Sequence, residues 1–180
     1  MQVARVVGFA ETLPFQNAVF DTVLSFNALH HFDLDTVLAA AARVLRCDGL
    51  LTVYTRTREQ NRRTVWGELF PHFADRETRL FTHADLQGAL ARRTEFESVT
   101  LKLVPWTLRM TASRLVEQAT GRYYSTFNFF TSEDFGAALA TFEARLAANY
   151  SDPQTSFGRT TTCYSSPAAV RVPGPGRASE

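Results

Sequence analysis

The sequence predicts an α/β fold built on a largely parallel sheet. Short apolar runs alternate with a helical pattern over residues 3–54, in the order strand, strand, helix, strand. The strand runs are apolar throughout and do not alternate with polar residues, which is typical of strands that helices cover on both faces. With 180 residues, of which 45% are hydrophobic and 21% charged, the chain has enough apolar material to bury the core of one domain.

The elements of the first half follow from their apolar spacing and their end signals. Apolar residues recur at helical spacing from Leu34 to Leu45, and Asp33 is the expected N-cap of that helix. Gly49 is expected to end the helix in a left-handed conformation. The predicted strands of this half are residues 3–9, 20–26 and 50–54.

The second half continues with helices in the connections between strands. Thr82 and Asp85 have the spacing of a capping box that opens a helix through Leu90. A longer helix is expected from Thr131 or Ser132, with its apolar residues on one face. Residues 167–180 contain too few apolar residues to pack and predict a disordered tail after a domain at 1–166. The other predicted elements are strands at 96–106 and 157–165 and a helix at 111–121.

Charge and composition exclude several classes of function. Nineteen basic and eighteen acidic residues leave a net charge of +1, which is too small to attract a polyanion, so we expect no nucleic-acid partner. No apolar run approaches the roughly 18 residues of a membrane span, and the first residues lack a signal-peptide pattern, so we expect a cytoplasmic protein without membrane contact. Cys47 and Cys163 stand far apart, with no spacing typical of a metal site or a disulfide framework.

Three blocks in the first third of the chain carry a distinctive pattern. They are GFAETLPF at 8–15, FDTVLSFNALHH at 20–31 and ARVLRCDG at 42–49. Together they resemble the core of a class I S-adenosylmethionine-dependent methyltransferase of the type 11 branch. The resemblance implies a Rossmann-like sheet that is mostly parallel with an antiparallel last strand, helices on both faces, and a helical lid inserted at about 107–150. It also implies S-adenosylmethionine as cofactor and methyl transfer to a small molecule as activity.

The resemblance assigns five residues to the cofactor. The loop after the family's third strand approaches the adenine, and Ala10 and Glu11 match its positions. Phe9 stands where the family has Asp or Asn, so backbone groups and ring stacking would replace a side-chain hydrogen bond. Asn27 and Ala28, which follow the next strand, are the other expected cofactor contacts.

Part of the family's cofactor site has no counterpart in this sequence. The glycine-rich loop that approaches the methionine end and the acid that holds the ribose would precede Val3, and the one Gly-x-Gly of the chain is Gly174-Pro175-Gly176. We therefore expect an N-terminally incomplete domain that binds little cofactor, shows no measurable methyl transfer alone, and self-associates through an exposed edge at residues 20–26. The alternative is a non-catalytic, methyltransferase-like binding or regulatory partner. A dinucleotide oxidoreductase is disfavoured because Gly-x-Gly-x-x-Gly is absent.

Two adjacent histidines are the candidate catalytic residues. His30 and His31 follow the strand at 20–26, at the edge where α/β sheets place their ligands. A neutral imidazole can take the proton of an attacking hydroxyl or amine near neutral pH. Capping or packing of the next helix is the alternative role. A metal site that also uses Asp33 and Asp35 is disfavoured, because adjacent histidines diverge and both aspartates suit a helix start.

The connections between the late strands are rich in aromatic residues. We expect most of these rings to be core, and the segments 66–81 and 123–146 to form a lid over a small apolar or aromatic acceptor. A basic run follows the strand at 50–54 and could bind an anionic substrate. Such runs more often form a solvent-exposed face without a ligand. This run is Arg56, Arg58, Arg62 and Arg63.

Overall fold

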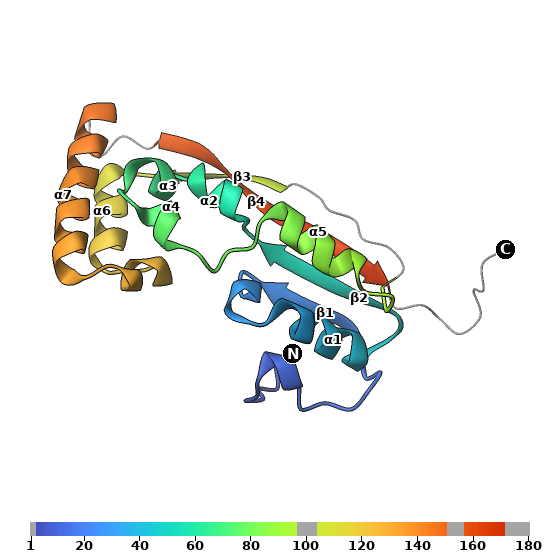
Figure 1. Cartoon of the computed structure of the whole chain (residues 1–180). Helices are drawn as coiled ribbons and strands as arrows, with labels where there is room; N and C mark the ends of the chain where they lie inside the picture. Colours follow the sequence, from blue (N-terminus) through green and yellow to red (C-terminus); the bar gives the residue numbers. More distant parts are fainter. Residues whose placement is uncertain (1–2, 97–103, 151–156, 172–180) are drawn as a thin grey trace. The chain divides into compact units, whose positions relative to one another are not determined.

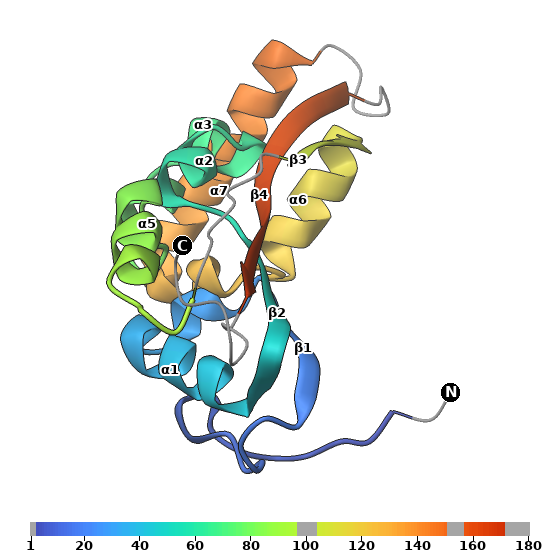
Figure 2. The same ribbon diagram turned by 90° about the vertical axis from the view of Figure 1, so that its right-hand side faces the viewer.

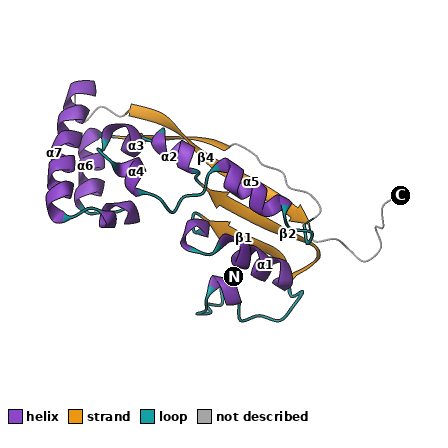
Figure 3. Cartoon of the chain, in the orientation of Figure 1, coloured by secondary structure: helices purple, strands orange, loops and turns teal. Residues whose placement is uncertain are grey.

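The computed structural model of the protein describes residues 3–96, 104–150 and 157–171 (Figure 1). These residues form two compact units. Unit 1 comprises Met1–Thr55, His83–Leu103 and Tyr164–Glu180, and unit 2 comprises Arg56–Thr82 and Val104–Cys163. Unit 2 is largely helical, whereas unit 1 combines strands with helices (Figure 3).

Unit 1 is built around a parallel pair of strands. β1 (Phe20–Phe26) pairs in parallel with β2 (Leu45–Thr55), and α1 (Leu34–Val44) connects them. On its other side β2 pairs in antiparallel fashion with the second half of β4 (Phe157–Arg171). Helix α5 (His83–Ala91) belongs to the same unit. The strand at 20–26 and the helices from Leu34 and after Thr82 are therefore confirmed, and β1 is an edge strand of the described sheet.

The prediction of a first strand at Val3 to Phe9 is wrong. This segment has no regular secondary structure, and within the described residues no strand pairs with it. Its apolar side chains face solvent, with Val7 100% and Phe9 78% exposed. An apolar run becomes a strand only where a neighbouring strand takes up its backbone hydrogen bonds, and none does so here.

The predicted end of the first helix also needs correction. α1 ends at Val44, and the chain enters β2 at Leu45 without a glycine cap. The left-handed residue of the following turn is Asp48, with φ 62°, and not Gly49. Gly49 is required for another reason, because a Cβ there would lie 2.7 Å from the backbone oxygen of Arg46. The turn is accommodated where the pairing of β1 with β2 shifts in register.

Unit 2 contains helices and one pair of antiparallel strands. β3 (Val104–Met110) pairs with the first half of β4. Thr111 and Thr131 each accept a hydrogen bond from the backbone three residues later and so cap two of the helices, as their sequence positions suggested. The helices are α2 (Arg58–Arg62), α3 (Val65–Leu69), α4 (Phe73–Arg76), α6 (Ala112–Thr120), the 3-10 helix η3 (Ser125–Phe129) and α7 (Ser132–Asn149).

Aromatic rings form the core of unit 2. Trp66 stacks on Phe142 with ring centroids 5.3 Å apart and an angle of 28° between the planes. Around this pair lie Phe70, Phe73 and Phe127, all at most 2% exposed. The segments predicted to form a lid therefore contribute most of their rings to one packed cluster, as expected for core residues.

A buried ion pair fastens a loop to this core. Both carboxylate oxygens of Glu77, a residue that is 4% exposed, accept hydrogen bonds from Arg79 at 2.6 and 2.9 Å. The hydroxyl of Thr126 donates to the same carboxylate at 2.6 Å. Burial alone would raise the pKa of Glu77, but the bonds from Arg79 and Thr126 outweigh it and hold the pKa below its ordinary value.

Two boundaries differ from the sequence predictions. The helical part of the insertion begins after Met110 and not at about 107, because residues 104–110 pair as β3. β4 continues to Arg171 and so includes the first residues of the predicted tail, since pairing with β2 uses backbone groups and needs few apolar side chains. The remaining tail, 172–180, and residues 97–103 of a predicted strand lie outside the described residues. In the described part of the chain, no helix is long and apolar enough to cross a membrane.

Candidate functional site

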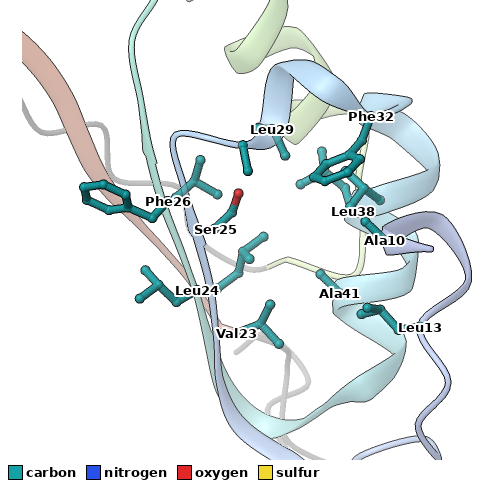
Figure 4. Close-up of a pocket in the computed structure, with 14 residues that line it drawn as sticks. Ala10, Leu13, Val23, Leu24, Ser25, Phe26, Leu29, Phe32, Leu38 and Ala41 are labelled. Atoms are coloured by element: carbon teal, nitrogen blue, oxygen red, sulfur yellow. The ribbon is translucent and has the colours of Figure 1, made fainter. Parts of the chain in front are cut away.

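Unit 1 contains an apolar cavity of about 210 Å³ between β1, α1 and the segment 10–13 (Figure 4). The side chain of Ser25 supplies the one hydroxyl of the lining, and all other lining side chains are apolar. Cavities of about 150 Å³ accept a benzene-sized ring, whereas sites for larger ligands usually exceed about 300 Å³. The cavity therefore has room for one uncharged ring system. Its lining residues are Ala10, Leu13, Val23, Leu24, Ser25, Phe26, Ala28, Leu29, Phe32, Val37, Leu38, Ala41, Leu51 and Val53.

The cavity brings together two of the five predicted cofactor residues. Ala10 begins the 3-10 helix η1 (Ala10–Thr12), Ala28 directly precedes the 3-10 helix η2 (Leu29–His31), and both line the cavity. Phe9, Glu11 and Asn27 are not part of the lining. Phe9 is 78% exposed.

Glu11 and Arg43 hold the loop that forms one wall of the cavity. One carboxylate oxygen of Glu11 accepts a hydrogen bond from the backbone N–H of Asp33, at 3.3 Å. The guanidinium of Arg43, on α1, donates to the backbone oxygens of Leu13 and Phe15, both at 2.7 Å. Segment 10–17 is thus fastened to α1 near both of its ends. The described role of Glu11 is to position this loop.

Asn27 makes the turn that leads from β1 to the histidines. Its φ of 48° lies in the left-handed region, which Asn tolerates better than most residues. Its backbone N–H donates to the backbone oxygen of Tyr54 at 2.6 Å, which fixes the end of β1 against β2. This geometry directs the chain into η2.

The two histidines lie beside the cavity. They form the end of η2, between Leu29 and Phe32, which both line the cavity. The rings of His30 and His31 are 4.1 Å apart at 43°, and His30 is half-buried whereas His31 is exposed. An exposed imidazole at the end of a parallel strand can exchange a proton with a molecule that approaches from solvent.

Asp33 serves α1 as its N-cap, as expected. It accepts hydrogen bonds from the backbone N–H of Thr36, at 2.9 Å, and from the Thr36 hydroxyl. These bonds hold the pKa of Asp33 below its ordinary value. Among the residues with described side chains, no group of three or more His, Cys, Asp or Glu is placed to hold a metal ion.

Two members of the basic run have structural partners. Arg58 donates to the backbone oxygen of Thr78 at 2.8 Å, and Arg62 pairs with Asp75 at 3.0 Å on the surface. Arg63 is exposed. These contacts hold turns of unit 2 together.

Sequence reasoning missed most of the cavity lining and the role of Arg43. Apolar residues such as Val23 and Leu38 look the same in a sequence whether they fill a core or line a cavity. One signal was present in the sequence. The strand predicted at residues 20–26 is apolar throughout and was expected to have an exposed edge, which indicates that some of its apolar side chains are not covered by other strands. The bonds of Arg43 join residues 28 and 30 positions apart, for which the sequence contains no local signal.

Known proteins that resemble this chain are methyltransferase domains. Residues 2–53 match the family model described as "Methyltransferase domain". A protein from Anabaena variabilis, described as a methyltransferase from an antibiotic biosynthesis pathway, aligns with a TM-score of 0.65 and 19% identity over 92% of this chain and 70% of its own. One from Anaeromyxobacter dehalogenans, described as a type II methyltransferase, aligns with a TM-score of 0.56 and 20% identity over 93% and 70%. No protein of curated function matches.

The chain spans only part of such proteins. It covers 72% of a Bacillus halodurans protein described as a methyltransferase, at 20% identity and a TM-score of 0.53. It covers 48% of a Thermotoga maritima S-adenosylmethionine-dependent methyltransferase, at 23% identity and a TM-score of 0.42. Residues 2–53 thus match the methyltransferase-domain family, and the chain has the fold of the methyltransferases with which it aligns.

Proposed function

We propose that the chain supplies the adenine-side and acceptor-side parts of an S-adenosylmethionine-dependent methyltransferase that acts on a small apolar or aromatic molecule. The observation that carries this proposal is the cavity at Ala10 and Ala28, which is formed by the segment that matches the family model. In this proposal β4 is the antiparallel last strand of the methyltransferase sheet, and the helices of unit 2 are its lid.

The lining fits one end of the cofactor. Adenine is a planar, uncharged ring system, for which an apolar cavity with a single hydroxyl from Ser25 is suitable. The ribose hydroxyls and the charged methionine end need carboxylates and backbone N–H groups. Among the residues that line the cavity there is no carboxylate and no glycine. The lining residues therefore suit the adenine and offer no such groups to the rest of the cofactor.

The histidines would act on the methyl acceptor. When bound, the cofactor supplies a methyl group that its positive sulfur already activates, so the protein has to position the acceptor and remove its proton. His31 is exposed at the end of η2 and can accept that proton, whereas half-buried His30 packs against its ring and would orient it. Two rings of the proposed lid, Tyr123 and Phe129, are 58% and 43% exposed.

A second function is favoured by the free edge of β1. Leu24 and Phe26 on this edge strand are 60% and 68% exposed. An apolar edge is a pairing site. These features suit a non-catalytic binding or regulatory partner with a methyltransferase-like fold.

One experiment separates the two functions. The chain is extended with the first two strands and the glycine-rich loop of a class I methyltransferase and is titrated with labelled S-adenosylmethionine. The methyltransferase proposal predicts micromolar binding, which Ala28→Trp abolishes by filling the cavity. Ala144→Trp, at an exposed position of α7, is the matched control. Binding that survives Ala28→Trp would contradict the proposed adenine site.

Acceptor screening completes this test. Transfer to aromatic acceptors in preference to small, highly charged ones is the expected result. Cofactor binding without transfer to any acceptor would favour the non-catalytic partner, and a preference for charged acceptors would argue against an apolar lid.

A further inference from the structure

Within the described chain, unit 1 contains two apolar segments that could take up a further strand partner. One is the outer edge of β1, and the other is residues 3–9, here called the arm. Both are seven residues long, FDTVLSF in β1 and VARVVGF in the arm. An exposed edge presents a row of backbone N–H and C=O groups that another extended segment can bind.

The side chains and charges of the two segments are compatible. Within the arm, Val3, Val6 and Val7 are 75%, 58% and 100% exposed, and none of these β-branched side chains is buried by the chain itself. Residues 22–26 of β1 contain no charge, proline or glycine that would block pairing. Each segment carries a single charge, of opposite sign, at Arg5 and Asp21, and Asp21 also pairs with Arg46 at 2.8 Å on the surface.

The arm is held away from the β1 edge of its own chain. Its base continues into segment 10–17, which Glu11 and Arg43 fasten to α1. Figure 2 shows the arm extending away from the unit and not lying along β1. Residues 3–9 of a second copy offer an apolar segment of matching length and opposite charge.

We propose that two copies of the chain exchange their arms, so that residues 3–9 of each copy add as a strand to the β1 edge of the other. Such a contact is reciprocal and closes as a two-fold dimer. It would bury the exposed valines of the arm and cover the edge, at Leu24 and Phe26, that is open in the single chain. This inference does not depend on whether the chain transfers methyl groups.

Sedimentation velocity of the 180-residue chain over a concentration series tests the proposal. The expected result is a monomer–dimer equilibrium with a micromolar Kd. Val6→Pro removes a backbone N–H from the arm, and Leu24→Lys places a charge on the edge; each should raise the Kd by about tenfold or more. Ala144→Lys, at an exposed position of α7 in unit 2, should leave the Kd unchanged. Both test sites are more than half exposed, and circular dichroism checks the fold of each variant.

Mixing the two variants distinguishes arm exchange from other dimers. In an equimolar mixture, the intact arm of the Leu24→Lys chain can still bind the intact edge of the Val6→Pro chain. The mixture should therefore dimerise more strongly than either variant alone and less strongly than the original chain. If Leu24→Lys disturbs the fold, Thr22→Lys at an exposed position of β1 replaces it. A chain that stays monomeric at all concentrations, or a dimer that Val6→Pro leaves unchanged, would overturn the proposal.

Discussion

Replacing Glu77 with Gln should destabilise unit 2 substantially. The carboxylate accepts two bonds from the Arg79 guanidinium, at 2.6 and 2.9 Å, one from the Arg79 backbone N–H, at 3.3 Å, and one from the Thr126 hydroxyl, at 2.6 Å. The neutral amide of Gln has only one oxygen that can accept these hydrogen bonds, and its NH₂ group would face the N–H or O–H donors that the second carboxylate oxygen now binds. Breaking a buried pair costs about 3–5 kcal/mol, but the Arg79 side chain is 26% exposed and can regain some water. We therefore expect a loss of about 2–3 kcal/mol.

Urea unfolding followed by tryptophan fluorescence measures this loss, because Trp66 lies inside the aromatic core of the same unit. Asp75→Asn is the matched control. Asp75 pairs with Arg62 at 3.0 Å, but both side chains are about 60% exposed (59% and 62%), and such surface pairs contribute at most about 1 kcal/mol. If Glu77→Gln cost no more than the control, the buried pair would not stabilise unit 2 and the argument would be refuted.

The same pair predicts a pH dependence. The pKa of Glu77 in the folded chain lies below its ordinary value of 4.5, so the unfolded chain binds the proton more readily. The contribution of the ionised group is therefore complete well above pH 4.5 and is lost as the pH falls through the lowered pKa of the folded state. The stability difference between the original chain and Glu77→Gln should narrow in acid. A difference that grew on acidification would contradict the assigned direction.

Packing, backbone space and proton transfer can each be tested by one further substitution. Phe142→Ala should lower the free energy of unfolding by about 3–5 kcal/mol, because Phe142 is 0% exposed. Phe129→Ala should lower it by less than about 1 kcal/mol, because Phe129 is 43% exposed. Equal losses in urea unfolding would refute the assignment of Phe142 to the core. Gly67→Ala should destabilise the protein by about 1–3 kcal/mol, because the new Cβ would overlap a backbone oxygen. Gly136→Ala should stabilise α7 by about 0.5–1 kcal/mol, because no atom lies within 4 Å of the position that its Cβ would take. In the chain extended by a glycine-rich segment, His31→Ala should lower kcat by about 100-fold, and unchanged turnover would assign His31 a packing role.

The helices α1, α5, α6 and α7 could be predicted from the sequence because their signals are local, whereas the short helices α2, α3 and α4 were not predicted. Asp33, Thr111 and Thr131 each cap a helix through a backbone group three residues later. A strand has no such local signal. Residues 3–9 and 20–26 are both short apolar runs, yet only the second finds a neighbour, in β2, and becomes a strand.

The candidate site could be predicted only in part, for a related reason. Ala10 and Ala28 were identified through a family pattern that extends along the sequence, and they line the cavity. Phe9 belongs to the same pattern but is 78% exposed. The contact between Glu11 and the backbone of Asp33 joins residues 22 positions apart, and periodicity gives no indication of such a contact.

Calorimetric titration of S-adenosylmethionine into the 180-residue chain tests the central claim most directly. In our proposal the cavity of unit 1 takes the adenine, and the residues that line it include no carboxylate or glycine for the ribose and methionine ends. If those missing contacts are worth about 4 kcal/mol, affinity falls by about a thousandfold, from micromolar to millimolar. The account predicts no saturable binding at micromolar cofactor. A micromolar Kd for these 180 residues alone would contradict it.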